Sequence, residues 1–251
     1  MISVDDAIQQ IERSDPFVFT IETQTSLGDR KTLLDVQNVV RSFDSRYVYL
    51  EVGSHVGGSL LPHLLDPCCA AAISIDPRPE SQPDERGLRF GYVQNTTSRM
   101  VTTLRNVVSE AGMGKLTTFE RDASKVTVDD IGKRARLAFI DAEHTNAAVF
   151  RDFLAIQPLL EPDALVVFHD SNLIFDALTN IVTMLTRQGI RHQAMYLPDN
   201  VFVLALGELA GPAISGLAGN AFDPVTFVET ARMRLNAEIA QNMMPVMAAA
   251  R

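Results

Sequence analysis

The chain has 251 residues, about 1.7 times the ~150 residues typical of one domain, so we expect one large α/β domain with terminal additions. Hydrophobic residues make up 46% and charged residues 21%, which excludes a mainly disordered or fibrous chain. The formal net charge is −9, and no stretch concentrates Lys or Arg, so nucleic acid is disfavoured as a partner.

The cysteines and the apolar runs indicate in which cellular compartment the protein is expected. Cys68 and Cys69 are adjacent, a spacing that suits neither a disulfide framework nor a zinc site. The N-terminus carries acids where a signal peptide has a basic start and an apolar run. No apolar stretch approaches ~18 residues without His, Asp or Pro. We therefore expect a cytoplasmic protein that does not span a membrane.

Two helices are predicted before the first strand, in an N-terminal extension over residues 1–46. In residues 3–13, Ser3 can cap the helix, and Val4, Ile8 and Ile11 share one face. Over residues 32–43 the apolar positions follow the period of 3.6 residues.

From residue 47, short apolar runs alternate with helical segments, which is typical of βαβ units around a parallel sheet. The predicted strands are 47–52, 71–75, 116–120, 137–140 and 164–168. The predicted helices are 59–65, 98–111, 146–160 and 173–188, the last three ended by Gly112, Pro162 and Gly189. The strands lack polar alternation because both faces of such a sheet are covered.

Two further strands are predicted over 192–196 and 201–206, and their short connection can join only antiparallel neighbours. The sequence thus predicts a doubly wound, mostly parallel, seven-stranded sheet that ends in an antiparallel hairpin, in a domain over residues 47–206. Residues 207–251 are predicted to be a Gly- and Ala-rich linker and a C-terminal helix that begins at Asp223 and Pro224.

The first strand runs directly into the sequence EVGSHVGGS, residues 51–59, and a helix follows. Gly53 and Gly57 allow backbone to approach a ligand closely, and free N–H groups at a helix start favour an anionic group such as a carboxylate. The next glycine after Gly53 is four positions on, so the dinucleotide fingerprint G-x-G-x-x-G is absent, which disfavours the rival reading as an NAD(P)-dependent oxidoreductase. An ordinary tight turn is the alternative.

Two acids follow the next two strands. Asp76 closes the second strand, where a carboxylate can accept hydrogen bonds from both ribose hydroxyls of a nucleoside. Asp122 follows the third strand, where a carboxylate can accept a hydrogen bond from an exocyclic amine of the base. The alternatives are a turn residue of Asp-Pro for Asp76 and an acid at a helix N-terminus for Asp122.

In this order, five segments resemble the class I S-adenosylmethionine-dependent methyltransferases: EVGSHVGGS, Asp76, ERDAS (120–124), FIDAEHT (139–145) and VVFHDSN (166–172). The last two look most like the small-molecule O-methyltransferase branch, whose fourth strand ends in Ile-Asp-Gly-x-His. The resemblance covers residues 47–206, including the closing hairpin, and implies a Rossmann-like methyltransferase fold. Ala142 in place of the family's Gly, and Pro162-Asp163-Ala164 in place of Pro-Gly-Gly, are departures from the pattern.

The resemblance implies a distribution of cofactor contacts. The methionine side would be lined by Glu51, Gly53 and Gly57, with Ser54 and Ser59 of the same run. Asp76 would bind the ribose, and Asp122 with Ala123 would contact the adenine. Asp141 would also contact the cofactor.

The fourth and fifth predicted strands end in Asp141 and Asp170, whose side chains should face one crevice because the strands are parallel neighbours. With an imidazole or an amide from the run His169-Asp170-Ser171-Asn172, either His169 or Asn172, they would suit a hard cation such as Mg²⁺, which could lower the pKa of a substrate hydroxyl. His144 could then take the proton, and in the catechol O-methyltransferase type a base occurs at the same offset of three residues from the aspartate. The alternative is that Asp141 only contacts the cofactor and that Asp170 caps the next helix.

We therefore expect an enzyme that methylates an oxygen of a small polar acceptor, with His144 and Asp141 as catalytic residues. A protein that binds the cofactor without turnover is the remaining alternative. The two terminal helices could form a homodimer face.

Overall fold

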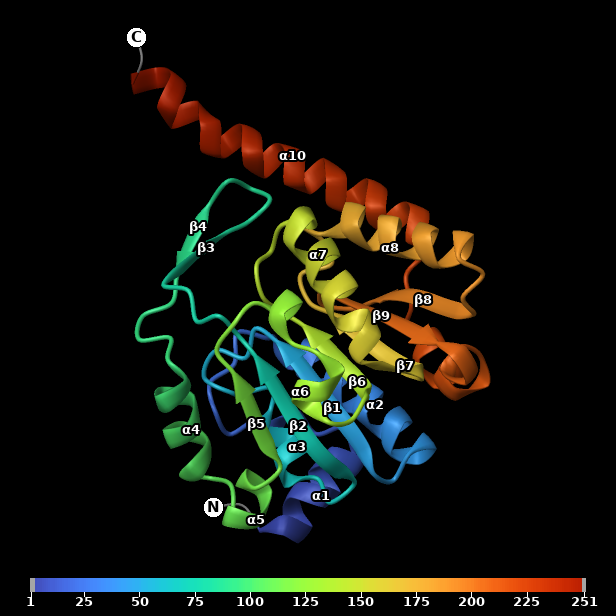
Figure 1. The fold of residues 1–251 in the computed structure, drawn as a ribbon. Helices are drawn as coiled ribbons and strands as arrows, with labels where there is room; N and C mark the ends of the chain where they lie inside the picture. Colours follow the sequence, from blue (N-terminus) through green and yellow to red (C-terminus); the bar gives the residue numbers. More distant parts are fainter. Residues whose placement is uncertain (1–2, 250–251) are drawn as a thin grey trace.

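The computed structural model describes residues 3–249, with side chains described up to residue 242. Its centre is a seven-stranded sheet in the order β5-β2-β1-β6-β7-β9-β8 (Figure 1). The parallel strands are β1 (Tyr47–Val52), β2 (Cys69–Ile75), β5 (Leu116–Phe119), β6 (Ala135–Ile140) and β7 (Leu160–Phe168). β8 (His192–Leu197) and β9 (Val201–Leu206) form the antiparallel end. The predicted fold class and closing hairpin are confirmed.

The central strands are buried on both faces. In β1, Tyr47 and Tyr49 belong to one apolar core, and Val48, Leu50 and Val52 belong to the other. This division follows from the two-residue period of a strand, and it explains why the strand sequences read as continuous apolar runs. Each fully buried Leu or Phe in these cores contributes about 1.5–3 kcal/mol, so the strand ends are held firmly.

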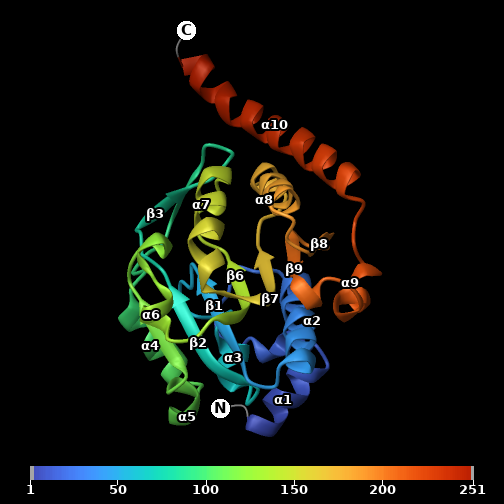
Figure 2. The same ribbon diagram turned by 45° about the vertical axis from the view of Figure 1, so that its right-hand side comes forward.

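The helices cover both faces of the sheet, and Figure 2 shows them from a second direction. They are α1 (Val4–Glu12), α2 (Leu27–Phe43), α3 (Leu61–Leu65), α4 (Thr97–Arg105), α5 (Glu110–Met113), α6 (Val128–Ile131), α7 (Asn146–Ile156), α8 (Phe175–Arg187), α9 (Ser215–Ala218) and α10 (Pro224–Ala249). In both views α10 lies above α8 and its C-terminal end projects away from the sheet. Within residues 3–249, no helix combines the length and the apolar character that crossing a membrane requires.

The structure corrects two of the predicted helices. The helix predicted over 98–111 is two helices, because α4 ends at Arg105 and Ser109 caps a separate α5, which contains Gly112 instead of ending before it. The helix predicted over 146–160 ends at Ile156 and gives way to a short 3₁₀ helix, Gln157–Leu159, because Pro158 has no N–H to donate to the carbonyl oxygen four residues earlier. β7 therefore begins at Leu160, and the irregular register beside it accommodates Pro162.

An antiparallel hairpin of β3 (Ser81–Pro83) and β4 (Arg89–Gly91) was not predicted. It lies at the same side of the molecule as α10 (Figure 1). Arg86 at its tip pairs with Glu238 of α10, with 3.4 Å between Nη1 and Oε2. The segment after β9 also packs on the body, since Leu209, Ile214 and Leu217 belong to the core. The division into three domains stays a prediction.

Candidate active site

The loop after β1 is shaped by close backbone packing. Gly53 has φ +91°, and a Cβ atom there would lie 2.7 Å from Cα of Ala142 and would collide with the carbonyl oxygen of Asp141. Gly57 has φ +87°, and its Cβ would meet Leu104 and Met100 of α4 at 3.0 Å. The loop therefore requires glycine at both positions for structural reasons, since residues with a side chain rarely adopt that backbone conformation.

A narrow cavity lies where this loop meets the ends of β2 and β6. It includes the predicted cofactor residues Gly53, Ser54, Ser59, Asp76 and Asp141 in its lining. Its other walls, which sequence reasoning missed, are residues 22–25 and a group from the β3–β4 region, Pro79, Gln82, Tyr92 and Asn95. The cavity volume is ≈ 40 Å³, well below the ~300–1,000 Å³ of typical small-molecule sites. Entry of a nucleoside therefore requires these walls to move.

Glu51 lies behind the cavity instead of lining it. Its carboxylate is fully buried and accepts hydrogen bonds from Tyr49 Oη (2.7 Å) and Ser59 Oγ (2.6 Å). Burial raises the pKa of Glu51 to about 8, although both hydroxyl donors act in the opposite direction. Glu51 thus reaches the cavity only through Ser59, which it orients.

Replacing Glu51 with glutamine should flatten the pH dependence of stability. Because the pKa of Glu51 is about 8 in the folded chain and 4.5 ordinarily, the folded state binds more protons between these values. The free energy of unfolding should therefore fall as pH rises from about 4.5 to about 8. Above pH 8 we expect the free energy of unfolding of Glu51→Gln, measured by urea denaturation, to exceed that of wild type by on the order of 1–3 kcal/mol.

The matched control is Glu229→Gln, which changes an exposed carboxylate of α10. It should leave the pH dependence as in wild type. A Glu51→Gln protein whose stability falls with pH as steeply as that of wild type would show that Glu51 does not titrate in this range.

Asp122 and Ala123 are not among the cavity residues. Asp122 accepts a hydrogen bond from the N–H of Ser124 (2.8 Å) at the start of the short 3₁₀ helix Ala123–Lys125, and the hydrogen bonds from Ser124 lower the pKa of Asp122. This is the capping role that the sequence left open. The adenine contact stays a prediction.

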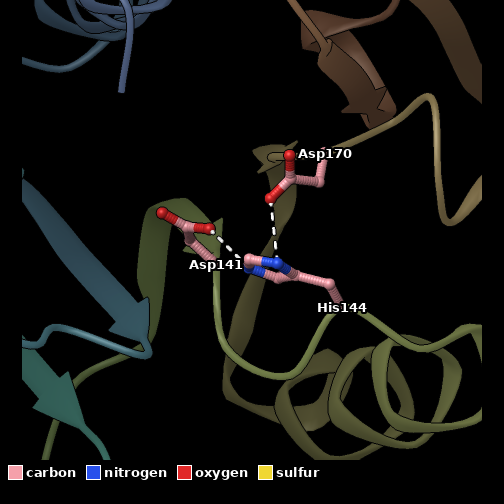
Figure 3. A group of neighbouring side chains, drawn as sticks. All are labelled: Asp141, His144 and Asp170. Carbon is pink, nitrogen blue, oxygen red and sulfur yellow. Dashed lines mark ion pairs between the residues drawn. The ribbon is translucent and has the colours of Figure 1, made fainter. Parts of the chain in front are cut away.

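Asp141, His144 and Asp170 converge at the carboxyl edge of the sheet (Figure 3). Asp141 follows β6, Asp170 follows β7, and His144 lies on the loop before α7. His144 Nε2 is 3.5 Å from Asp141 Oδ1, and His144 Nδ1 is 3.2 Å from Asp170 Oδ2. One potential ligand atom from each residue lies within 4.8 Å of the others, a spacing that suits a metal ion. Asp170 has φ 52°, so backbone strain accompanies this placement.

His169 also contacts the cluster, and its side chain is buried. Its Nδ1 is 3.2 Å from Asp170 Oδ2 and 3.4 Å from Asp141 Oδ1, and its Nε2 is 3.2 Å from Asp29 Oδ2. Asp29 was missed, although it belongs to the Ser26 capping box that begins α2 five residues before the predicted start. The N-terminal extension therefore supplies a buried carboxylate to the site.

Carboxylates and imidazoles balance one another in this cluster. Burial acts to lower the pKa of His169, but the charge of Asp141 and hydrogen bonds to the three carboxylates raise it well above its ordinary value. Burial also opposes protonation of His144, whose pKa is raised by Asp141 and Asp170. The imidazoles in turn hold the pKa of Asp141 well below its usual range against the effect of burial. The cluster can thus keep its acids ionised with either protons or a cation between them.

The β3–β4 hairpin is fastened to this cluster. The N–H of Glu85 donates to the carbonyl oxygen of His144 (3.1 Å), and Asp84 forms an isolated bridge with His144. The Glu85 carboxylate accepts a hydrogen bond from the N–H of Asn146 at the start of α7. The hairpin therefore fixes the backbone that carries His144.

Comparisons with known proteins bear on the family and the fold. Residues 50–171 match a family model described as a methyltransferase domain. Among solved structures, the O-methyltransferase TomG from Streptomyces achromogenes in complex with SAM is 15% identical, with a TM-score of 0.51, over 84% of this chain and 92% of that chain. Cofactor-bound Rv0187 from MTB is 13% identical, with a TM-score of 0.52, over 80% of this chain and 88% of that chain. A search of curated proteins returned no match.

The matched residues include Glu51, Asp76, Asp141 and Asp170, and the solved structures share the fold. Residues 50–171 therefore carry a methyltransferase domain, within a chain that has the Rossmann-like fold of its structural neighbours.

Proposed function

We propose that the enzyme transfers the methyl group of S-adenosylmethionine to a hydroxyl oxygen of a small polar acceptor, with assistance from Mg²⁺. One observation carries the proposal. Asp141 lines the cavity that contains Asp76 and the glycine loop, and it also belongs to the cluster with His144 and Asp170. A cofactor in that cavity would therefore lie beside groups able to hold and deprotonate a hydroxyl.

The residues present suit the cofactor. Asp76 offers carboxylate oxygens to a ribose diol, and the loop before α3 offers backbone N–H groups to a carboxylate. When bound, S-adenosylmethionine supplies a sulfonium methyl group as the electrophile. The protein then has to align the acceptor oxygen with that methyl group and remove a proton.

The donor set also suits a hard cation. Asp141 and Asp170 provide oxygen ligands, which Mg²⁺ prefers. His169 directs Nδ1 toward both carboxylates while Nε2 faces Asp29, the arrangement in which a carboxylate orients a metal-binding histidine. A cation held there would lower the pKa of a hydroxyl bound to it.

His144 is the proposed base. It is less buried than His169, with a side chain that is 21% exposed against 8%, so an acceptor has access to it. Its loop is held by the hairpin through Glu85, which limits how far the imidazole can move. The similarity in fold to the O-methyltransferase TomG agrees with oxygen as the atom that is methylated. A cytoplasmic location and a homodimer stay predictions.

Methyl transfer should require a divalent cation. With methyl-labelled S-adenosylmethionine and a panel of small phenols, sugars and other alcohols, we expect transfer to oxygen that EDTA abolishes and Mg²⁺ restores. Asp170→Asn should raise the Mg²⁺ concentration for half-maximal rate by on the order of 10–100-fold, because one anionic ligand is lost.

Asp176→Asn is the matched control, since Asp176 is an exposed acid of α8 paired with Arg232, and it should behave as wild type. Full activity of wild type and of Asp170→Asn in EDTA would remove the metal from the account. Binding of S-adenosylhomocysteine with no transfer to any acceptor would favour the reading as a protein that binds the cofactor without turnover.

A further inference from the structure

We infer that Arg78 is a specificity- and affinity-determining residue of the cofactor site, one that occupies the ribose-binding carboxylate of Asp76 and must release it when a nucleoside diol binds. The inference rests on the proposed cofactor site. Arg78 Nη1 lies 3.2 Å from Asp76 Oδ2, and the two side chains are only 3% and 5% exposed. No motif in the sequence indicated this pair, because Arg78 lies in the loop after β2.

Three groups crowd the carboxylate of Asp76. Its Oδ2 accepts the N–H of His55 (3.0 Å) and forms an ion pair with the guanidinium, and its Oδ1 accepts the N–H of Arg78 (2.7 Å). A carboxylate has about four acceptor positions, so the two backbone N–H groups leave about two, the number that a ribose diol needs. The guanidinium nitrogen, 3.2 Å from Oδ2, occupies the space from which one of these hydroxyls would approach. At least one of the three groups therefore has to move when ribose binds.

The guanidinium is the group that can leave. The other two are backbone N–H groups, at His55 with φ 42° and at Arg78 with φ 58°, and moving them would rearrange the loops themselves. The guanidinium moves by side-chain rotation alone. Its Nη1 also donates to the carbonyl oxygen of His55 and to Asn95 Oδ1 (3.2 Å). The guanidinium therefore still has hydrogen-bond acceptors nearby once a ribose has bound Asp76.

The surroundings show that Arg78 is held under constraint. Its Nε is buried without a hydrogen-bond partner among the described residues, and its Nη2 faces Met100 Sδ at 3.0 Å. Buried donors normally have partners, so this position is costly for a guanidinium. Two residues next to Arg78 line the nearby cavity of ≈ 40 Å³. Pro79 follows Arg78 in sequence, and Asn95 accepts a hydrogen bond from its guanidinium. Displacement of Arg78 would coincide with the opening that a nucleoside requires.

The test compares two ligands and two arginines by calorimetry. S-adenosylhomocysteine should bind Arg78→Met about tenfold more tightly than wild type, because no guanidinium competes for the carboxylate. An analogue that lacks both ribose hydroxyls should bind both proteins with equal affinity, since it does not require Asp76. Arg99→Met removes a neighbouring positive charge whose guanidinium contacts Val93, not Asp76, and should leave both affinities unchanged.

A purely structural role of Arg78 gives a different pattern. If Arg78 only orients Asp76, Arg78→Met should bind S-adenosylhomocysteine more weakly than wild type does, and that result would overturn the inference. Equal tightening of both ligands would also overturn it, because the gain would not depend on the diol. Arg78→Lys, which keeps the charge but makes fewer directed hydrogen bonds, should fall between wild type and Arg78→Met, and it serves if Arg78→Met does not fold.

The outcomes separate this inference from the proposed function. Binding to wild type without tightening in Arg78→Met would sink the inference and leave the cofactor site in place. Absence of binding in wild type, Arg78→Met and Arg78→Lys alike would overturn the cofactor site itself, and the inference with it.

Discussion

Replacing His144 with alanine should lower kcat by on the order of 10²–10⁴. Both ring nitrogens lie at the cluster, Nδ1 3.2 Å from Asp170 and Nε2 3.5 Å from Asp141, so the imidazole is aimed at the place where an acceptor hydroxyl would bind. The Michaelis constant for S-adenosylmethionine should change little, because His144 is not among the cavity residues. Steady-state rates at saturating Mg²⁺, with acceptor and cofactor varied in turn, measure both effects.

His192→Ala is the matched control for this change. His192 lies on the edge strand β8, remote from the cluster in the sheet order, and its replacement should leave kcat within about twofold of wild type. A loss of less than about threefold in His144→Ala across the pH range would assign proton removal to another group.

Asp76→Asn should weaken binding of S-adenosylhomocysteine by on the order of 10²-fold or more. Two hydrogen bonds from hydroxyls to an ionised carboxylate are expected to contribute about 1.5–3 kcal/mol each, and the amide keeps one oxygen acceptor at most. Asparagine has nearly the same shape, so it is the better variant than alanine for a side chain that is 5% exposed. Asp5→Asn is the matched control, because Asp5 is an exposed acid of α1 that does not line the cavity.

The sheet could be predicted from the sequence because its strands are buried on both faces. β1 and β9 have the predicted limits, and the other strands differ only by residues added or lost at their ends. The strand-end residues Asp141 and Asp170 could be placed together because parallel neighbours bring their carboxyl ends to one edge. Each of these arguments depends on local periodicity or on sheet topology, which the sequence carries directly.

The walls of the site could not be predicted in the same way. The β3–β4 hairpin is short and half-exposed, so it lacks the apolar alternation that marks a strand. Asp29 reaches His169 through the packing of α2 against the sheet, a contact 140 residues apart in sequence. The pairing of Arg78 with Asp76 depends on left-handed backbone at Arg78. No sequence pattern predicts that conformation at an arginine, because residues other than Gly and Asn seldom adopt it.

The glycine loop shows that a glycine can have two separate reasons to stand at one position. Gly53 does lie at the cavity, as expected for a cofactor loop. Its missing side chain, however, is required by Asp141 and Ala142 of the neighbouring loop, and that of Gly57 by α4. Glycines at these positions therefore indicate tight packing of the strand ends as much as they indicate a ligand.

Calorimetric titration of the full chain with S-adenosylhomocysteine, for wild type, Asp76→Asn and Asp5→Asn in parallel, tests the cofactor site most directly. We expect one site per chain in wild type, an affinity lower by on the order of 10²-fold in Asp76→Asn, and no change in Asp5→Asn. Absence of binding to folded wild type, or equal affinity of wild type and Asp76→Asn, would contradict the placement of the cofactor against Asp76.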